Sequence, residues 1–192
     1  MPSLPPDIQK AVRANPAVAR VLDNWAAIDL PDSWLVAGSV VQSYWNAAHG
    51  LPPHHGIDDV DVVYFDPDDL SEEAEAEHAS RISAMFDGAG VRFDVKNQAR
   101  VHLWYESRFG IPIQAYRSSR DAIDTFPTTA GAVGVRPQHG SLEAYTSFGF
   151  DDLLGLVVRP NKRLVTEEVY SAKVARWKPL WSKLRIVGWN DE

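Results

Sequence analysis

The stretch Ile57-Asp58-Asp59-Val60-Asp61-Val62-Val63-Tyr64-Phe65 carries the clearest structural pattern in this chain of 192 residues. Its Val, Tyr and Phe content predicts a β-strand, which the turn residues 66–69 bring to an end. Because successive side chains of a strand point to opposite faces, Asp59 and Asp61 project together while the apolar residues between them enter the core. Two such carboxylates repel each other when bare, and they are suited to converge on a hard divalent cation. The alternative is an edge strand whose acidic face deters edge-to-edge pairing.

A short apolar run precedes this strand. Residues Trp34-Leu35-Val36-Ala37 stop at Gly38-Ser39, and apolar side chains then recur at helical spacing over residues 40–48. The pattern predicts a strand, a tight turn and a helix. A glycine in such a turn lets the backbone approach a ligand, and the N–H groups that open the helix point at an anion, so a phosphate is expected there. The alternative is an ordinary turn and helix cap.

A second alternating segment, Val91-Arg92-Phe93-Asp94-Val95-Lys96, predicts another strand with one wet face. We expect this strand to continue through residues 103–105. Asp94 lies on its polar face, so a neighbouring strand would add a third carboxylate. Three acids around two metal ions can hold a triphosphate and lower the pKa of an attacking hydroxyl. The alternative is an exposed acid that Arg92 and Lys96 balance.

The rest of the chain alternates helices and short strands, which indicates an α/β or α+β fold with a small mixed β-sheet flanked by helices. The length favours a single domain over residues 1–192, with a core of about 18–160 and a C-terminal helical extension of about 161–192. Helices are expected over 18–25, from Ser71 to Gly88, from Ser118 to Phe126, over 151–156 and from Thr166 to Pro179, a hairpin over 132–145, and a loop over 49–56.

Composition excludes several classes of function. The chain has 19 Lys and Arg against 26 Asp and Glu, a net charge of −7, so it lacks the overall basic excess of a protein that binds long nucleic acid. The absence of cysteine excludes disulfides, thiolate zinc sites and cysteine nucleophiles. No run approaches the ~18 apolar residues of a membrane span and no signal peptide is evident, so we expect a cytoplasmic protein without a membrane partner.

These motifs together resemble a known superfamily. Residues 34–39, followed by Asp59-Val60-Asp61-Val62 and a later acid on a strand, look like the DNA polymerase beta-like nucleotidyltransferases. Residues 59–66 and 95–104 are similar to a narrower bacterial nucleotidyltransferase-like family, long described as a domain of unknown function, and the similarity extends over 130–136, 149–153 and 159–161. The resemblance implies that Gly38 and Ser39 contact nucleotide phosphates. It also implies that Asp59, Asp61 and Asp94 bind Mg²⁺, with Mn²⁺ as the alternative. The loop over 49–56 is longer than the superfamily pattern.

Three further polar residues, Asn97, Arg100 and His102, belong to the motif of the narrower family. Arginine forks onto phosphate and asparagine can read a base edge, so Asn97 and Arg100 are candidate nucleotide-binding residues. The alternative makes Asn97 a turn or cap residue and Arg100 a partner of the acids. The role of His102 is open.

Other side chains have two interpretations each. His54 and His55 are either metal ligands near the acids or solvated loop residues. Trp104 and Trp177 either belong to the core or stack on a base.

The resulting hypothesis is a Mg²⁺-dependent nucleotidyltransferase that moves a nucleoside monophosphate from a nucleoside triphosphate to a hydroxyl acceptor by a two-metal mechanism. The acceptor is a small molecule, a protein side chain or an RNA end. Two alternatives use the same residues: an Asp-x-Asp glycosyltransferase that binds a nucleotide sugar, and a non-catalytic nucleotide-binding regulator.

Overall fold

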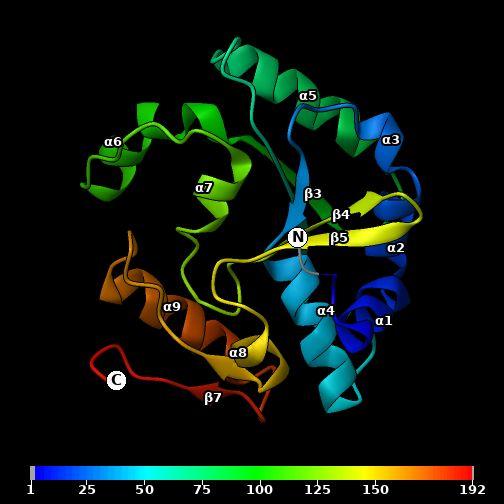
Figure 1. Ribbon diagram of the computed structural model, residues 1–192, viewed down its shortest axis with the longest axis vertical. Coiled ribbons are helices and arrows are strands. Elements are labelled where there is room, and N and C mark those ends of the chain that lie inside the picture. The colour runs from blue at the N-terminus through cyan, green and yellow to red at the C-terminus, as the bar shows by residue number, and fades with distance from the viewer. Residues whose placement is uncertain (1–2, 192) are drawn as a thin grey trace.

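A mixed five-stranded sheet forms the centre of the computed structural model, which describes residues 3–191 (Figure 1). β2 and β3 pair in parallel, and the other neighbouring strands pair antiparallel. The predicted small mixed sheet flanked by helices is therefore confirmed. In spatial order the strands are β3 (Arg92–Asn97), β2 (Asp59–Tyr64), β1 (Trp34–Val36), β4 (Gly134–Gln138) and β5 (Ser141–Tyr145).

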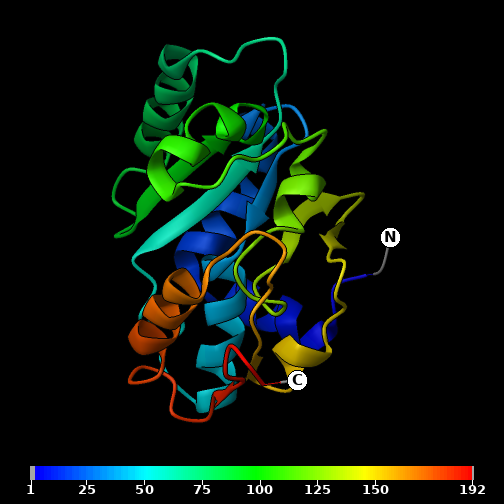
Figure 2. The ribbon, with the colours of Figure 1, turned by 90° about the vertical axis from the view of Figure 1, so that its left-hand side faces the viewer.

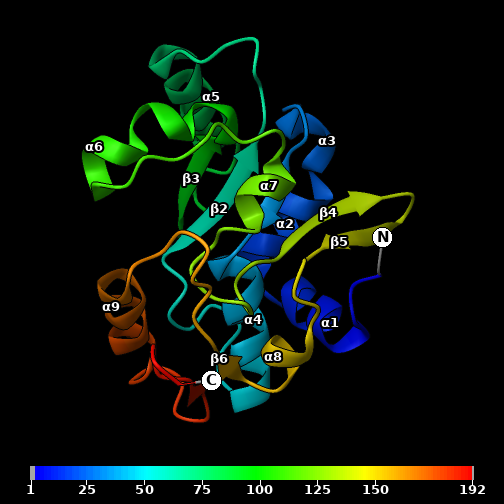
Figure 3. The same ribbon diagram turned by 60° about the vertical axis from the view of Figure 1, so that its left-hand side comes forward.

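Helices cover both sides of this sheet. In Figure 1, α6, α7 and α9 lie on the side away from α1 and α2, and Figure 3 again shows α6 and α9 away from these two helices. No helix among residues 3–191 has the length and apolar character needed to cross a membrane. The helices are α1 (Pro6–Ala14), α2 (Pro16–Asp23), α3 (Trp25–Ile28), α4 (Gly38–His49), α5 (Glu72–Met85), the 3-10 helix η1 (Gln98–Leu103), α6 (Tyr105–Phe109), α7 (Ser119–Ile123), α8 (Asp151–Leu154) and α9 (Glu167–Trp177).

Helix starts follow the sequence signals. The side chains of Ser71, Ser118 and Thr166 accept hydrogen bonds from backbone N–H groups and open α5, α7 and α9, as predicted. Pro16 is the first residue of α2, where its missing N–H costs nothing. The helix expected over 18–25 is divided, because α2 ends at Asp23 and a separate turn, α3, follows.

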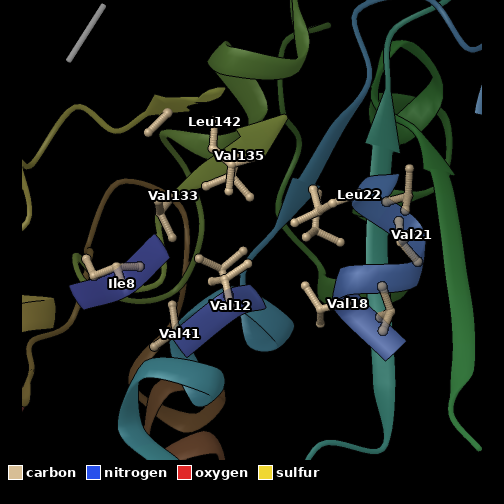
Figure 4. Packing of buried hydrophobic residues seen from close by; sticks show 14 of the residues in the cluster. Ile8, Val12, Val18, Val21, Leu22, Val41, Val133, Val135 and Leu142 are labelled. Atoms are coloured by element: carbon tan, nitrogen blue, oxygen red, sulfur yellow. The ribbon is translucent and has the colours of Figure 1, made fainter. Parts of the chain in front are cut away.

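The main core lies on one face of the sheet. Strand alternation places Leu35, Val60, Val62 and Val95 on this face, where α1, α2 and α4 pack against them. Figure 4 shows side chains of α1 and α2 in one cluster with residues of β4 and β5. The opposite face carries a smaller apolar cluster of Trp34, Val36, Val63 and Ile123. This second face is less completely covered by apolar side chains, and the acidic residues of β2 and β3 lie on it.

The predicted continuation of β3 through residues 103–105 is wrong. β3 ends at Asn97, whose Oδ1 accepts hydrogen bonds from the N–H groups of Ala99 and Asp66, both at 3.0 Å. Such local side-chain bonds offer the backbone an alternative to the strand ladder. The chain therefore enters η1, and Leu103, Trp104 and Tyr105 lie where η1 ends and α6 begins.

The C-terminal segment returns to the body of the protein. Trp181 is fully buried, its ring lies edge-on to Trp45 of α4 at 5.3 Å between centroids, and its Nε1 donates to Asn46 Oδ1 at 2.7 Å. Strand β7 (Arg185–Ile186) then pairs in parallel with β6 (Val157–Val158), which the sequence pattern did not indicate. These contacts fix both ends of α9 in place.

Candidate active site

Asp59, Asp61 and Asp94 lie on the less covered face of the sheet. Asp59 and Asp61 are alternate residues of β2, and the parallel register places Asp94 of β3 directly opposite Asp61. The structure therefore brings the three predicted carboxylates together on two adjacent strands. Figure 2 looks onto this side, with α6 toward the upper end of the sheet and α9 toward the lower.

Negative charge accumulates around Asp61. Burial raises the pKa of Asp61 to about 7, and the nearby Asp59 and Asp94 raise this pKa too, against smaller opposing effects of Lys173 and Arg92. Removing water disfavours the charged carboxylate, and neighbouring like charges add repulsion. Asp61 is thus the group whose charge most needs a further cation.

Two basic side chains pair with Asp59 and Asp94. Arg92 Nη2 lies 2.9 Å from Asp59 Oδ2, and Lys96 Nζ lies 3.7 Å from Asp94 Oδ1. In this arrangement, no three acidic or histidine side chains within residues 3–191 are close enough together to hold a metal ion. The side chains of Arg92 and Lys96 are 75% and 47% exposed, and exposed ion pairs of this kind contribute only about 0–1 kcal/mol. Both can therefore turn to solvent, and the three sets of hard carboxylate oxygens suit Mg²⁺.

The turn between β1 and α4 approaches Asp61 closely. A Cβ atom on Gly38 would lie 3.5 Å from Asp61 Oδ2 and 3.4 Å from Gln42 Nε2, so a larger side chain here would fill the space beside the carboxylate. The preceding Ala37 adopts φ 49° and ψ −121°, a conformation that costs a non-glycine residue on the order of 1–3 kcal/mol. Strained backbone of this kind occurs preferentially at ligand sites.

Ser39 contributes its backbone to this turn. Its side chain is fully buried, and the hydroxyl donates to the Val36 carbonyl at 3.4 Å without lining the cavity beside Asp61. As the first residues of the twelve-residue helix α4, Gly38 and Ser39 have no intrahelical partners for their N–H groups. An anion at this turn would therefore meet N–H groups and not the serine hydroxyl.

A cavity of about 550 Å³, here called the donor cavity, opens beside the three carboxylates. Gly38 and Gln42 line it next to the aspartates, and α9 forms part of the remaining wall. Three basic residues of this cavity, Arg108, Lys173 and Arg176, make no ion pair with any part of the described chain.

The position of Lys173 matters electrostatically. Burial lowers the pKa of Lys173, and the charge of Arg176 lowers it further, while Asp61 and Asp59 act in the opposite direction. Sequence reasoning missed Lys173, Arg176 and Arg108. The spacing of Lys173 and Arg176 places them on one helix face, but nothing in the sequence indicates that this face turns toward the aspartates.

Comparison with known proteins identifies the family of this chain. A family model described as nucleotidyltransferase matches residues 23–186. The chain belongs to the nucleotidyltransferase family. This match confirms the resemblance that the strand and turn motifs carried.

Two solved structures are similar to this nucleotidyltransferase. The first, an NMR structure reported to reveal a CCA-adding enzyme head domain, is 30% identical with a TM-score of 0.77 and covers 94% of each chain. The second is a Thermotoga maritima CCA-adding enzyme in complex with tRNA, 15% identical with a TM-score of 0.56. It covers 95% of this chain and 43% of that chain, and at this identity it shows the fold alone. No curated protein sequence matches the nucleotidyltransferase.

Asn97 of the nucleotidyltransferase lies outside the donor cavity. Its Nδ2 donates to the carbonyls of Asp66 and Asp69, at 2.9 and 3.1 Å, in addition to the two bonds that its Oδ1 accepts. The buried amide therefore ties the end of β3 to the loop after β2. This is the turn and cap role, with no polar atom left for a base.

Arg100 is held by α5. Its Nη1 lies 2.9 Å from Glu75 Oε1, and its Nε donates to the Leu70 carbonyl at 3.3 Å. The partner is thus Glu75 and not the three aspartates. Arg100 does not reach the donor cavity, but it lines a second cavity next to it.

The three histidines considered above do not line the donor cavity. His54 is exposed, and the His55 ring lies edge-on to Trp181 at 6.0 Å between centroids. His102 is a half-buried residue of η1. A metal bound by the aspartates would therefore have no histidine ligand from these positions as they stand.

Proposed function

We propose that this nucleotidyltransferase moves a nucleoside monophosphate from a nucleoside triphosphate to a hydroxyl acceptor, with Mg²⁺ held by Asp59, Asp61 and Asp94. One observation carries the proposal: three carboxylates line the same cavity as three basic side chains that have no ion-pair partner among residues 3–191. Carboxylates alone would repel a triphosphate. A cavity that presents both kinds of charge suits a triphosphate together with a divalent cation.

The donor set supports Mg²⁺. The three aspartates offer only oxygen ligands, and burial together with the charges of Asp59 and Asp94 raises the pKa of Asp61, so a bound cation would favour its charged form. When bound, the ion would offset this repulsion and stabilise negative charge on the phosphate oxygens. Mn²⁺, which also favours oxygen ligands, is the alternative.

The basic residues and the helix start bind the triphosphate. We assign Lys173 and Arg176 to the β- and γ-phosphates, because both project from α9 into the donor cavity. The N–H groups of Gly38 and Ser39 contact the same phosphates at the positive end of α4. Fixed cations and N–H groups also stabilise the pyrophosphate that leaves.

The chemical step is an in-line displacement. The acceptor hydroxyl oxygen bonds to the α-phosphorus, the bond between this phosphorus and the bridging oxygen to the β-phosphate breaks, and pyrophosphate leaves with the bond electrons. Asp94 accepts the hydroxyl proton, since it is the aspartate at the junction of the donor cavity with the next cavity. Catalysis consists mainly of positioning and charge stabilisation.

The similarity to CCA-adding enzymes makes an RNA end a candidate acceptor. The overall charge of −7 argues against a long nucleic acid, but charge is unevenly distributed. Residues 159–185 contain eight basic residues and two acidic ones, and Lys173 and Arg176 of the donor cavity belong to this segment. A basic segment of this kind can contact a few phosphates near the site.

Ligand-dependent stability tests the donor site. Thermal unfolding is measured with Mg²⁺ and ATP, GTP, CTP or UTP for the wild type and for Asp59→Asn/Asp61→Asn. A triphosphate at 100 times its Kd adds about 2.7 kcal/mol of stability. We expect a metal-dependent shift with at least one triphosphate in the wild type and no shift in the double variant. Release of pyrophosphate with that triphosphate then measures turnover.

Asp58→Asn is the matched control, because Asp58 is an exposed neighbour of the same acidic stretch that does not line the donor cavity. It should keep the wild-type shift. The proposal fails when no triphosphate shifts the wild type although Mg²⁺ or Mn²⁺ alone does. A shift by a nucleotide sugar in that case would favour the glycosyltransferase alternative.

A further inference from the structure

A second cavity continues from the donor cavity. It has a volume of about 660 Å³ and is lined by residues of η1, α6 and the segment around Phe126. The two cavities share Asp94, Lys96, Arg108 and Lys173 among their lining residues, so they form one continuous cleft. Asp94, to which we assign the acceptor proton, lies where they meet. We call this second cavity the aromatic compartment.

Three neighbouring aromatic rings line this compartment. The ring centroids of Tyr105 and Phe109 are 4.6 Å apart, and Trp104 lies 6.0 and 6.5 Å from them. Phe109 is 39% exposed, and the adjacent Leu103 is 57% exposed. Rings of this kind gain free energy when a planar group covers them.

Two arginines line the compartment, and they differ in their ion pairing. Arg100 is neutralised by the buried Glu75, whose Oε1 lies 2.9 Å from the Arg100 Nη1. Arg108 has no ion-pair partner among residues 3–191, and its guanidinium lies 5.5 Å from the centre of the Phe109 ring. A cation is therefore available beside the exposed aromatic surface. This combination suits a ligand that joins a planar ring to an anionic group.

Another part of the lining is held in place by its own contacts. The hydroxyl groups of Tyr116 and Thr125 lie 2.8 Å apart, and Tyr116, Thr125 and Phe126 all line the compartment. A hydrogen bond thus fixes part of the compartment's lining. Such a fixed space favours a small rigid ring over a flexible chain, because less conformational entropy is lost on binding.

We propose that the aromatic compartment binds the acceptor as a nucleotide. Its base stacks on Trp104, Tyr105 and Phe109, its phosphate contacts Arg108, and its sugar hydroxyl reaches Asp94. This inference rests on the proposed function and names its acceptor. The hydroxyl oxygen of the bound nucleotide forms the new bond to the α-phosphorus of the donor, its proton passes to Asp94, and pyrophosphate leaves from the donor. The product is the acceptor extended by one nucleotide.

Binding in the absence of metal and triphosphate tests the compartment by itself. The probes are adenosine 5′-monophosphate and a single-stranded oligoribonucleotide of six residues, titrated calorimetrically into the full chain. Phe109→Ala removes one ring of the compartment, and Phe109 does not line the donor cavity. Because one stacking ring is lost, we expect this variant to bind both probes about 5- to 150-fold more weakly than the wild type does.

Phe148→Ala is a closely matched control. Phe148 is 36% exposed and also lies against a guanidinium, that of Arg163 at 5.0 Å, but it lines neither cavity. It should bind both probes as the wild type does. Phe109→Tyr keeps the ring and should bind both probes as the wild type does. If substitution of Phe109 disrupted α6 in general, Phe109→Tyr would bind as weakly as Phe109→Ala.

The two probes separate the sources of the nucleotide. Equal affinity for both indicates a free nucleotide as acceptor, and tighter binding of the oligoribonucleotide indicates the end of an RNA strand. The inference is overturned if neither probe binds the wild type, or if Phe109→Ala binds as the wild type does. The stability shift with Mg²⁺ and a triphosphate is recorded for the same variants. If the wild type shows no such shift, the proposed function is refuted. If the wild type shows the shift but binds neither probe, only the acceptor assignment is refuted.

Discussion

Asp61 should destabilise the metal-free protein above neutral pH, and Asp61→Asn should remove this destabilisation. The pKa of Asp61 is raised from 3.8 to about 7, so the folded state holds the Asp61 proton more tightly than the unfolded state does. Between about pH 4 and pH 7 the unfolded chain therefore releases this proton first, and the free energy of unfolding falls as pH rises. At 1.36 kcal/mol for each pKa unit, the loss is on the order of 4 kcal/mol and is complete above pH 7.

Urea unfolding in the presence of EDTA measures this effect. With seven tryptophans, intrinsic fluorescence reports the transition. At pH 8, Asp61→Asn should be more stable than the wild type by on the order of 4 kcal/mol, and near pH 4 the two should have similar stability. Mg²⁺ at pH 8 should stabilise the wild type more than the variant, because Asp61 is one of the proposed ligands.

Asp58→Asn removes the same charge at an exposed position three residues before Asp61, and Asp58 does not line the donor cavity. It should follow the wild-type pH profile. The reasoning is refuted if Asp61→Asn and the wild type keep the same difference in unfolding free energy from pH 4 to pH 8, since the Asp61 carboxylate would then be no harder to ionise in the folded protein than in the unfolded chain.

Three other substitutions test the framework around the cleft. Ala37→Gly should raise stability by about 1 kcal/mol, because glycine adopts φ 49° and ψ −121° without a Cβ clash; a lower melting temperature would contradict the strain at this turn. Glu75→Ala should cost about 3–5 kcal/mol in urea unfolding, since it leaves Arg100 buried without its partner; a cost below about 1 kcal/mol would show that this pair is not effectively buried. Trp181→Phe should cost about 1–3 kcal/mol, because Asn46 Oδ1 loses its indole donor, and unchanged stability would argue against this bond.

Local patterns predicted most of the sheet and the carboxylates. Alternation in residues 57–65 and 91–96 depends only on strand geometry, so it placed Asp59, Asp61 and Asp94 on one face, as the strand register has them. The same reasoning offered Arg92 and Lys96 as partners of Asp94, but it could not show that Arg92 pairs with Asp59 instead. Those contacts depend on rotamers, which the sequence pattern does not specify.

Long-range pairing explains what the sequence did not reveal. β6 and β7 contain two residues each and exist only because distant segments pair, so no local period marks them. Asn97 fits a polar ligand by residue type, but three of the four hydrogen bonds of its side chain involve backbone groups of the loop after β2, and the fourth caps η1. Lys173 resembles an ordinary basic residue of a surface helix until the return of the chain at Trp181 places α9 beside the aspartates.

The pairing of β6 with β7 also bears on the order in which the chain is synthesised. The strands that carry the aspartates leave the ribosome well before α9 and Trp181. A nascent chain that ends before residue 186 lacks part of the β6–β7 pair, and one that ends before residue 173 also lacks Lys173 and Arg176 of α9. Under the proposed function, the donor cavity therefore becomes complete only after α9 has been translated, well after the strands that carry its aspartates.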